Sequence, residues 1–315
     1  MKPNSKLTMI GFVVVALILT VTCMGVILFA TPLWAADAPA ATAPAEGEKH
    51  GESLTEVNKK LSNPISSTWS IQFQQNNYLL DPGPGQSLRW NSNLNFQPVM
   101  PVPLTSNWNL ITRIVLPLFN SQPHPDPHNP TNIERTTGFG DTAWMEMLSP
   151  SPKLVGGNWL LGLGPTFILP TASTDWTGQD KWQVGPAVVV GYLSKKWMLG
   201  AFVQNWTSTG GSGDRGTNQM NLQPIATYFL PHGWSFGYSG NVLANWKAGS
   251  AGDTWTVPLG LNVAKVVNIA GLHVKLQLAG QYMVHQPDHF GQKWNIQWQM
   301  TPVIPDPIKR PLFGD

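Results

Sequence analysis

Apolar and polar residues alternate along most of the chain after about residue 67. In residues 88–98 the apolar Leu88, Trp90 and Phe96 share one parity, and Arg89 shares the other parity with Asn and Gln. A β-strand sends successive side chains to opposite faces, so this pattern predicts a strand with one apolar and one polar face. The same alternation is clear in residues 234–246, 272–284 and 294–304.

Less regular strands are predicted between these segments, near residues 68–79, 108–118, 140–148, 159–169, 182–193, 197–206, 218–229 and 254–266. The total is about twelve strands of roughly ten residues each, which is the length that crosses a bilayer at a tilt of about 45°. An even number of antiparallel strands places the N- and C-terminal ends of the chain on the same side of the membrane, in the periplasm. The pattern therefore predicts an all-β fold, a transmembrane antiparallel up-and-down β-barrel.

The connections and the tryptophans support this interpretation. Long connections are expected on one side of the barrel, at residues 119–139, 170–181, 207–217, 247–253 and 285–293, after a shorter first one at 80–87. Trp residues fall at predicted strand ends, where Trp108, Trp159, Trp197 and Trp234 form one belt and Trp182, Trp206, Trp246, Trp255 and Trp294 the other. Two aromatic belts are typical of outer-membrane barrels. A soluble β-sandwich, the alternative, gives no reason for Trp to collect at strand ends.

The N-terminus has the order of a secretory signal peptide. Two lysines lie within the first six residues, an apolar stretch follows at residues 9–30, and small residues occupy positions 35–36. Cleavage there removes residues 1–36 together with Cys23, the only cysteine, so the mature chain has no disulfide or cysteine-based metal site. An uncleaved membrane anchor and lipidation of Cys23 are the alternatives.

Three further segments follow the signal peptide. Residues 37–66 are predicted to be a flexible leader, because an Ala-, Pro-, Glu- and Gly-rich stretch cannot bury a core. The barrel is expected to occupy residues 67–304, and residues 305–315 form a C-terminal tail.

The amino-acid composition is consistent with a transmembrane β-barrel, whose strands face lipid on one side and water on the other. Charged residues make up 11% of the chain, against about 25% in soluble domains. The hydrophobic fraction is nevertheless only 42% and the mean hydropathy is −0.10, which is too polar for a helical membrane protein. A net charge of +2 gives no argument for a nucleic-acid partner.

Several ordered motifs add a resemblance to these patterns. They are Phe139-Gly140-Asp141-Thr142, Gly164-Pro165-Thr166-Phe167-Ile168-Leu169-Pro170-Thr171, Lys181-Trp182-Gln183-Val184-Gly185-Pro186, Leu222-Gln223-Pro224, Leu230-Pro231-His232-Gly233-Trp234 and Val257-Pro258-Leu259-Gly260. Together they resemble a bacterial outer-membrane β-barrel family, the "MetA-pathway of phenol degradation" family, whose transporter-like members are sometimes mislabelled neuromedin U. The resemblance implies a Gram-negative outer-membrane barrel and leaves the substrate open.

The expected function is transport. We predict an outer-membrane protein, secreted through the inner membrane and inserted by the barrel-assembly machinery, that contacts outer-membrane lipid and acts as a porin-like passive channel or transporter for small-molecule solutes, aromatic or anionic ones among them. One alternative is an occluded, non-conducting barrel with a structural or surface-binding role. Another is a soluble lipocalin-like binder.

The polar strand faces are predicted to line the lumen and the solute path. The residues concerned are Arg89, Arg113, Glu146, Gln183, Gln223, Asn241, Lys275, Gln277, Gln281, Gln297 and Gln299. Amide side chains could fill the lumen or line a narrow path through it. Three cations against one acid predict a weak preference for anions.

No catalytic machinery is predicted, so the protein is expected not to be an enzyme and to need no cofactor. A barrel phospholipase needs a Ser, a His and an orienting Asn or Asp together at its rim, and no His stands in such a context on a predicted strand. His124, Asp126 and His128 in one loop, and His285 and His289 in another, are weak metal candidates. Imidazoles and carboxylates bind zinc, copper or nickel, but Pro and Asp in loops are equally explained by turn formation.

Overall fold

The computed structural model describes residues 52–83, 85–129, 132–212, 215–288, 290–308 and 310–313. These residues belong to one compact unit, Glu52–Asp315. The predicted signal peptide (1–36), the first part of the predicted leader (37–51) and His289 lie outside the described residues. No helix within the described part of the chain is long and apolar enough to cross a membrane.

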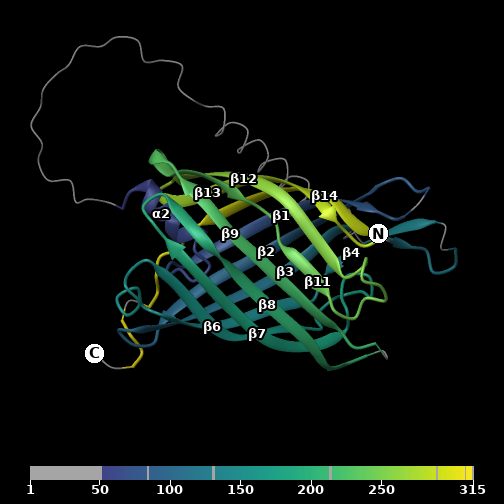
Figure 1. Cartoon of the computed structure of the whole chain (residues 1–315), viewed down its shortest axis with the longest axis horizontal. Coiled ribbons are helices and arrows are strands. Elements are labelled where there is room, and N and C mark those ends of the chain that lie inside the picture. Colours follow the sequence, from purple (N-terminus) through teal and green to yellow (C-terminus); the bar gives the residue numbers. More distant parts are fainter. Residues whose placement is uncertain are drawn as a thin grey trace, which may run out of the picture. The chain divides into compact units, whose positions relative to one another are not determined.

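One antiparallel sheet closes on itself, because β1 pairs with both β2 and β14 (Figure 1). Helix α2 (Leu54–Ser62) precedes the sheet, and a 3₁₀-helix, η1 (Pro231–Gly233), connects β9 to β10. The strands are β1 (Ser70–Asp81), β2 (Arg89–Pro103), β3 (Trp108–Pro125), β4 (Ile133–Phe139), β5 (Thr142–Pro150), β6 (Trp159–Leu169), β7 (Lys181–Leu193), β8 (Trp197–Gly211), β9 (Asn218–Phe229), β10 (Trp234–Tyr238), β11 (Val242–Asn245), β12 (Trp255–Ile269), β13 (Leu272–His285) and β14 (Gly291–Pro302).

These strand segments make a barrel of 12 strands. Segments β4 and β5 both pair with β3 and are separated only by Gly140 and Asp141. Segments β10 and β11 both pair with β9 and β12, and residues 239–241 separate them. Each couple is therefore one barrel strand with a local interruption. The predicted all-β antiparallel barrel is confirmed.

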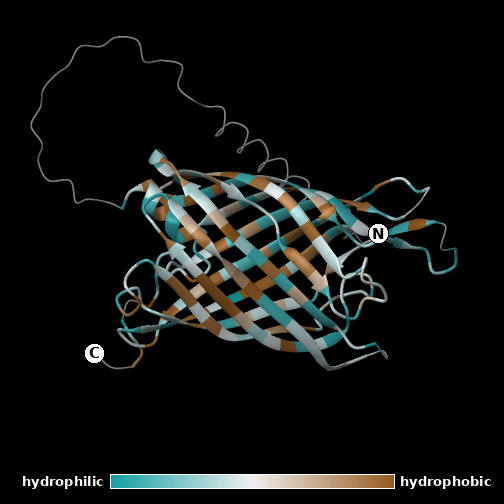
Figure 2. Ribbon diagram, in the orientation of Figure 1, coloured by the Kyte–Doolittle hydropathy of each residue, from teal (hydrophilic) through white to brown (hydrophobic). Residues whose placement is uncertain are grey.

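The predicted alternation places apolar residues on the outside of the barrel and polar residues inside. Figure 2 shows hydrophobic and hydrophilic residues alternating along the strands. On β14, Trp294 and Ile296 are exposed, whereas Asn295 between them is buried. On β12, Leu259 and Leu261 expose 65% and 73% of their surface. An apolar exterior around a polar interior is what a lipid-facing barrel requires.

Most of the predicted aromatic belts lie on the outer face. The exposed Trp residues at strand ends are Trp108, Trp159 and Trp197 on the side of α2, and Trp182, Trp246 and Trp294 on the opposite side. Trp206 differs, because it shares its parity with the inward-facing Met198 and Phe202 and is only 6% exposed. Its Nε1 donates a hydrogen bond to Thr166 Oγ1 at 3.1 Å. The prediction that placed Trp206 in the outer belt is therefore wrong, since it used position along the strand without parity.

The long connection predicted at residues 119–139 is largely a β-hairpin. Strand β3 continues to Pro125, and its ladder with β4 extends to the pair Pro125–Ile133. The pairing of β3 with β2 ends at Ser121, so the prolines of the extension lie beside a free strand edge, where a missing N–H is tolerated. The predicted connection at residues 119–139 is therefore corrected to a β-hairpin over most of its length.

The end of the predicted flexible leader is ordered. Helix α2 begins after Ser53, whose Oγ accepts a hydrogen bond from the backbone N–H of Glu56 at 3.3 Å. Glu56 lies in the first turn and Lys59 and Lys60 in the last, which complements the helix dipole. The prediction of flexibility up to residue 66 is thus corrected, because this segment carries capping signals that the Ala- and Pro-rich residues before it lack.

Two strand glycines differ in how closely the neighbouring strand approaches. A Cβ on Gly164 would lie 1.9 Å from the carbonyl oxygen of Glu146, whereas a Cβ on Gly280 would meet no atom within 4 Å. We expect Gly164→Ala to lower the free energy of unfolding by about 1–3 kcal/mol, because β5 and β6 must move apart. Gly280→Ala serves as the control and should leave it nearly unchanged. Urea unfolding in detergent micelles measures both variants, and equal effects would contradict the close approach of β5 and β6.

Candidate functional site

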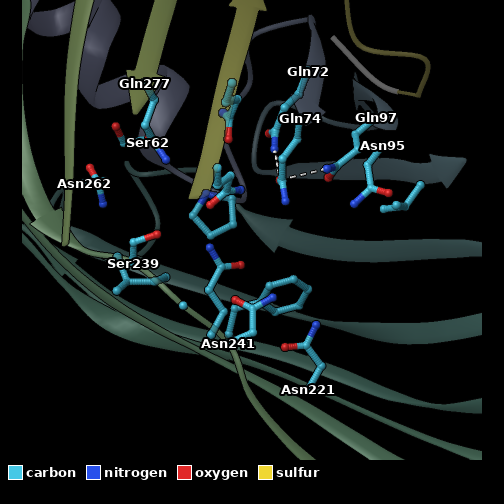
Figure 3. Close-up of a pocket in the computed structure, with 18 of the residues that line it drawn as sticks. Ser62, Gln72, Gln74, Asn95, Gln97, Asn221, Ser239, Asn241, Asn262 and Gln277 are labelled. Atoms are coloured by element: carbon cyan, nitrogen blue, oxygen red, sulfur yellow. Dashed lines mark hydrogen bonds between the residues drawn. The ribbon is translucent and has the colours of Figure 1, made fainter. Parts of the chain in front are cut away.

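A cavity of about 390 Å³ lies inside the barrel. Inward-facing residues of most strands form its walls, and residues that follow α2 close one end. Figure 3 shows amide side chains from several strands pointing toward one another across this space, among them Gln74, Asn241 and Asn262. The lumen is therefore lined by groups that both donate and accept hydrogen bonds.

Most of the residues predicted to line the lumen lie around this cavity. They are Arg113, Gln223, Asn241, Lys275, Gln277, Gln281, Gln297 and Gln299. Gln183 lies nearer the opposite end of the barrel, where it forms hydrogen bonds with Gln179 and Gln219. Arg89 is the first residue of β2 and lies at that same end. A role for these residues in a solute path stays a prediction.

Glu146 does not face the lumen. On β5, Met145 and Met147 are the buried, inward-facing residues, and Glu146 shares the opposite face with the exposed Trp144. Its carboxylate accepts hydrogen bonds from Thr112 Oγ1 at 2.7 and 2.9 Å and from Trp144 Nε1 at 2.8 Å. The prediction of Glu146 as a lumen residue is wrong, because β5 is apolar on both parities and a single charge was assumed to face water.

A chain of hydrogen-bonded amides runs across the inner faces of β1–β3. Arg113 Nη2 donates to Gln97 Oε1 at 2.5 Å, and Gln97 Nε2 donates to Gln74 Oε1 at 3.1 Å. Gln74 Nε2 in turn donates to Asn76 Oδ1 at 3.1 Å, while Gln72 Nε2 donates to Gln74 Oε1 at 2.9 Å (Figure 3). Because a guanidinium group can only donate, Arg113 fixes the orientation of the amides that follow.

The charges on the cavity wall are all positive. No Asp or Glu of the described residues lines the cavity, whereas Lys60, Arg113 and Lys275 do. Lys60 forms an ion pair with Glu52 at 2.8 Å. The ammonium group of Lys275 donates to Ser62 Oγ at 2.7 Å, so this cation is held by a neutral oxygen. In a space walled by protein such charges attract anions more strongly than they would in open water.

The cavity also has an apolar side. Met145, Met198, Phe202 and Ile225 line it from β5, β8 and β9, and they belong to one buried cluster of apolar side chains. Trp206 lies on the same side. The cavity is therefore amphipathic: the apolar cluster lies on β5, β8 and β9, whereas amide side chains line β1, β2, β13 and β14 and also reach the cavity from β8 and β9.

The segment that contains α2 closes one end of the lumen. Asn58 is fully buried, and its Nδ2 donates to the carbonyl oxygen of Gly233 at 2.9 Å and to Ser235 Oγ at 3.0 Å. Beyond the helix, Ile65 packs into the same apolar cluster as Met147 of β5. Residues 52–66 thus cross the barrel from the wall at β10 to the wall at β5.

At the opposite end, one loop is tied to the junction of β4 and β5. Asp141 accepts hydrogen bonds from the backbone N–H of Ala172 at 3.2 Å and of Gln179 at 2.6 Å. Thr177 Oγ1 donates to the carbonyl oxygen of Phe139 at 2.8 Å. Two of the motifs noted in the sequence therefore meet here, and together they hold residues 170–180 against the barrel.

The weak metal candidates take part in other contacts. The ring of His124 stacks on Trp176 with centroids 4.2 Å apart, and Asp126 Oδ1 accepts from the backbone N–H of His128 at 2.8 Å, which is a turn interaction. His285 Nε2 lies 2.9 Å from a backbone oxygen of the loop between β11 and β12. Among the described residues, no three His, Cys, Asp or Glu side chains come together as a metal site would need.

Sequence reasoning missed the lumen residues of β1. Gln72, Gln74 and Asn76 line the cavity, but residues 72–77 read Gln-Phe-Gln-Gln-Asn-Asn and are polar on both parities. The parity of Phe73, which faces outward against Phe96, was the signal that could have identified them.

The fold is similar to the crystal structure of an outer membrane channel from Pseudomonas putida F1. The TM-score is 0.55 and the sequence identity 14%, over 77% of this chain and 98% of that chain. At this identity the similarity shows the fold alone. No family model and none of the curated proteins matches the sequence, so membership of the phenol-degradation-pathway family stays a prediction.

The contacts of Asp141 lead to a prediction about residues 170–180. We expect Asp141→Ala to accelerate proteolytic cleavage of this loop by about tenfold or more, because each hydrogen bond to a charged group contributes about 1.5–3 kcal/mol. Asp175→Ala, an exposed position in the same loop, is the control and should not change the rate. Limited proteolysis followed by mass spectrometry measures both. A loop that stays equally protected in both variants would show that Asp141 does not hold it.

Proposed function

We propose that the protein is an outer-membrane channel for passive diffusion of small anionic solutes, with the α2 end of the barrel in the periplasm. The observation that carries the proposal is a cavity whose wall, in the described part of the chain, has positive charges and no carboxylate, inside a closed barrel with an apolar exterior. The exterior suits lipid, and the similarity in fold to a bacterial outer membrane channel agrees with it. In this proposal the barrel-assembly machinery inserts the exported chain into the outer membrane. The protein is proposed to have no catalytic role.

The outward position of Glu146 strengthens the expected preference for anions. With that acid outside, the inward-facing charges at Arg89, Arg113 and Lys275 have no inward partner among the acids predicted from the sequence. Clusters of Arg and Lys favour anions in a pore, because the low-dielectric wall prevents the field from spreading.

Reversal potentials in a salt gradient test the channel proposal. We expect the mature protein in a planar bilayer to conduct with anion selectivity, and the double variant Arg89→Gln and Arg113→Gln to lose most of that selectivity. Glu146→Gln is the control, and its selectivity should match that of the unchanged protein. Cation selectivity, or anion selectivity that survives the double substitution, would contradict the proposal.

A non-conducting barrel is the second candidate, and residues 52–66 favour it specifically. The buried Asn58 and the contact of Lys275 with Ser62 hold this segment across the lumen. If the segment never moves, the barrel is occluded and its role is structural or surface binding. If it moves, it is a plug that limits conduction.

Removing the segment separates these two candidates. We expect deletion of residues 52–66 to increase the single-channel conductance, because it opens one end of the lumen. Asn58→Asp should raise the open fraction by about tenfold or more, since a carboxylate cannot donate to the carbonyl oxygen of Gly233 and the buried hydrogen bond is lost. Glu52→Gln, which removes only the exposed ion pair with Lys60, is the control and should leave the open fraction unchanged. Heat-modifiable migration on gels shows that each protein has a folded barrel. If neither the unchanged protein nor any of these folded variants conducts, the occluded barrel is established.

A further inference from the structure

We infer that the lumen cavity contains a binding site for the carboxylate group of a small amphipathic acid, and that Arg113 is the residue that binds this group. The inference rests on the proposed channel function only for the route by which the solute arrives, and it names the class of solute.

The first argument is an excess of hydrogen-bond donors on one wall. Arg113 uses Nη2 on Gln97, but its Nε has no hydrogen-bond partner among the described residues. At the far end of the amide chain, Asn76 Nδ2 is buried and also has no partner within the described structure. Buried donors without acceptors are costly, so a ligand that brings acceptor oxygens gains binding free energy here.

The orientation of the amides follows from the cation. Gln97 must turn its oxygen toward Arg113, which leaves its N–H groups to face Gln74, and Gln74 passes the same polarity to Asn76. The side-chain oxygens of Gln97, Gln74 and Asn76 therefore already accept hydrogen bonds from the protein. Asn221 Oδ1, on β9, is a buried acceptor on the cavity wall without a partner among the described residues, and it suits a hydroxyl group of a ligand.

The second argument is the absence of a competing acid. No Asp or Glu of the described residues lines the cavity, and the nearest carboxylate on β5, that of Glu146, points outward onto Thr112. In most proteins a buried guanidinium is neutralised by a carboxylate. Arg113 has a neutral amide in that place. A planar two-oxygen anion matches the forked donors of Arg better than a spherical ion does.

The third argument is the position of Arg113 between the two sides of the cavity. On one side its guanidinium donates to Gln97 of β2, two residues from its ladder partner Val99, and on the other side its ladder partner is Met145 of β5. A carboxylate held by Arg113 therefore has the amides on one side and the apolar surface of Met145, Phe202 and Trp206 on the other. An acid with an apolar body uses both sides, whereas chloride or acetate uses one. The cavity of about 390 Å³ is within the range of about 300–1,000 Å³ that is usual for small-molecule sites.

Equilibrium binding to the folded mature protein in detergent tests the site without depending on conduction. The probes are benzoate, its uncharged analogue benzamide, and acetate, each measured by isothermal titration calorimetry. We expect benzoate to bind at least about tenfold more tightly than either of the others, because it alone combines the charge with an apolar body. Arg113→Gln should remove this preference for benzoate over benzamide. Lys196→Gln removes a positive charge from the exposed turn between β7 and β8, outside the lumen, and should keep this preference.

The outcomes separate this inference from the channel proposal. Equal binding of benzoate and benzamide, or a preference that survives Arg113→Gln in a barrel that still shows heat-modifiable migration, would overturn the site even if the protein conducts. Equal binding of benzoate and acetate would contradict the inference that the site prefers an acid with an apolar body. Selective benzoate binding by a protein that shows no conductance would support the site and contradict the channel.

Discussion

Closure of the sheet is the constraint on which the other features of this structure depend. Because β1 pairs with β14, the barrel part of the sheet has no exposed edge, and each of its strands must direct alternate side chains into one interior and onto one exterior. With 12 strands the interior is wider than a layer of side chains fills by direct contact. Long amide side chains, an apolar cluster and residues 52–66 occupy the space together.

The hydrogen bonds inside the barrel then determine how its Gln and Asn side chains are oriented. Amides can pair with one another in either orientation, so a wall of Gln and Asn is neutral until a charge gives it a direction. Arg113 supplies this direction through Gln97 and Gln74. Polar groups on the outer face follow the same principle. Glu146 is held there by donors from Thr112 and Trp144, which replace the water that this face lacks in the proposed membrane setting.

Different contacts hold the segments at the two ends of the barrel. At one end, Lys275 contributes both a positive charge to the cavity and a hydrogen bond to Ser62 of the segment that crosses the lumen. An anion bound by the remaining N–H groups of Lys275 would lie beside Ser62, which places a bound solute next to residues 52–66. At the other end, Asp141 holds a loop through backbone N–H groups, and Trp176 of this loop stacks on His124.

The sequence by itself determined the architecture, because a period of two is a local property that any strand between lipid and water must show. It predicted the strands, the closed barrel and the inward direction of Gln297, Gln299 and Lys275. It did not determine the parity of β5, where both faces are apolar and Glu146 was assigned inward, or that of β1, where both are polar. The hairpin beyond Ser121 and the packing of residues 52–66 against Met147 and Ser235 were likewise decided by the tertiary structure. These features depend on contacts between residues far apart in the chain, which exist only once the sheet has closed.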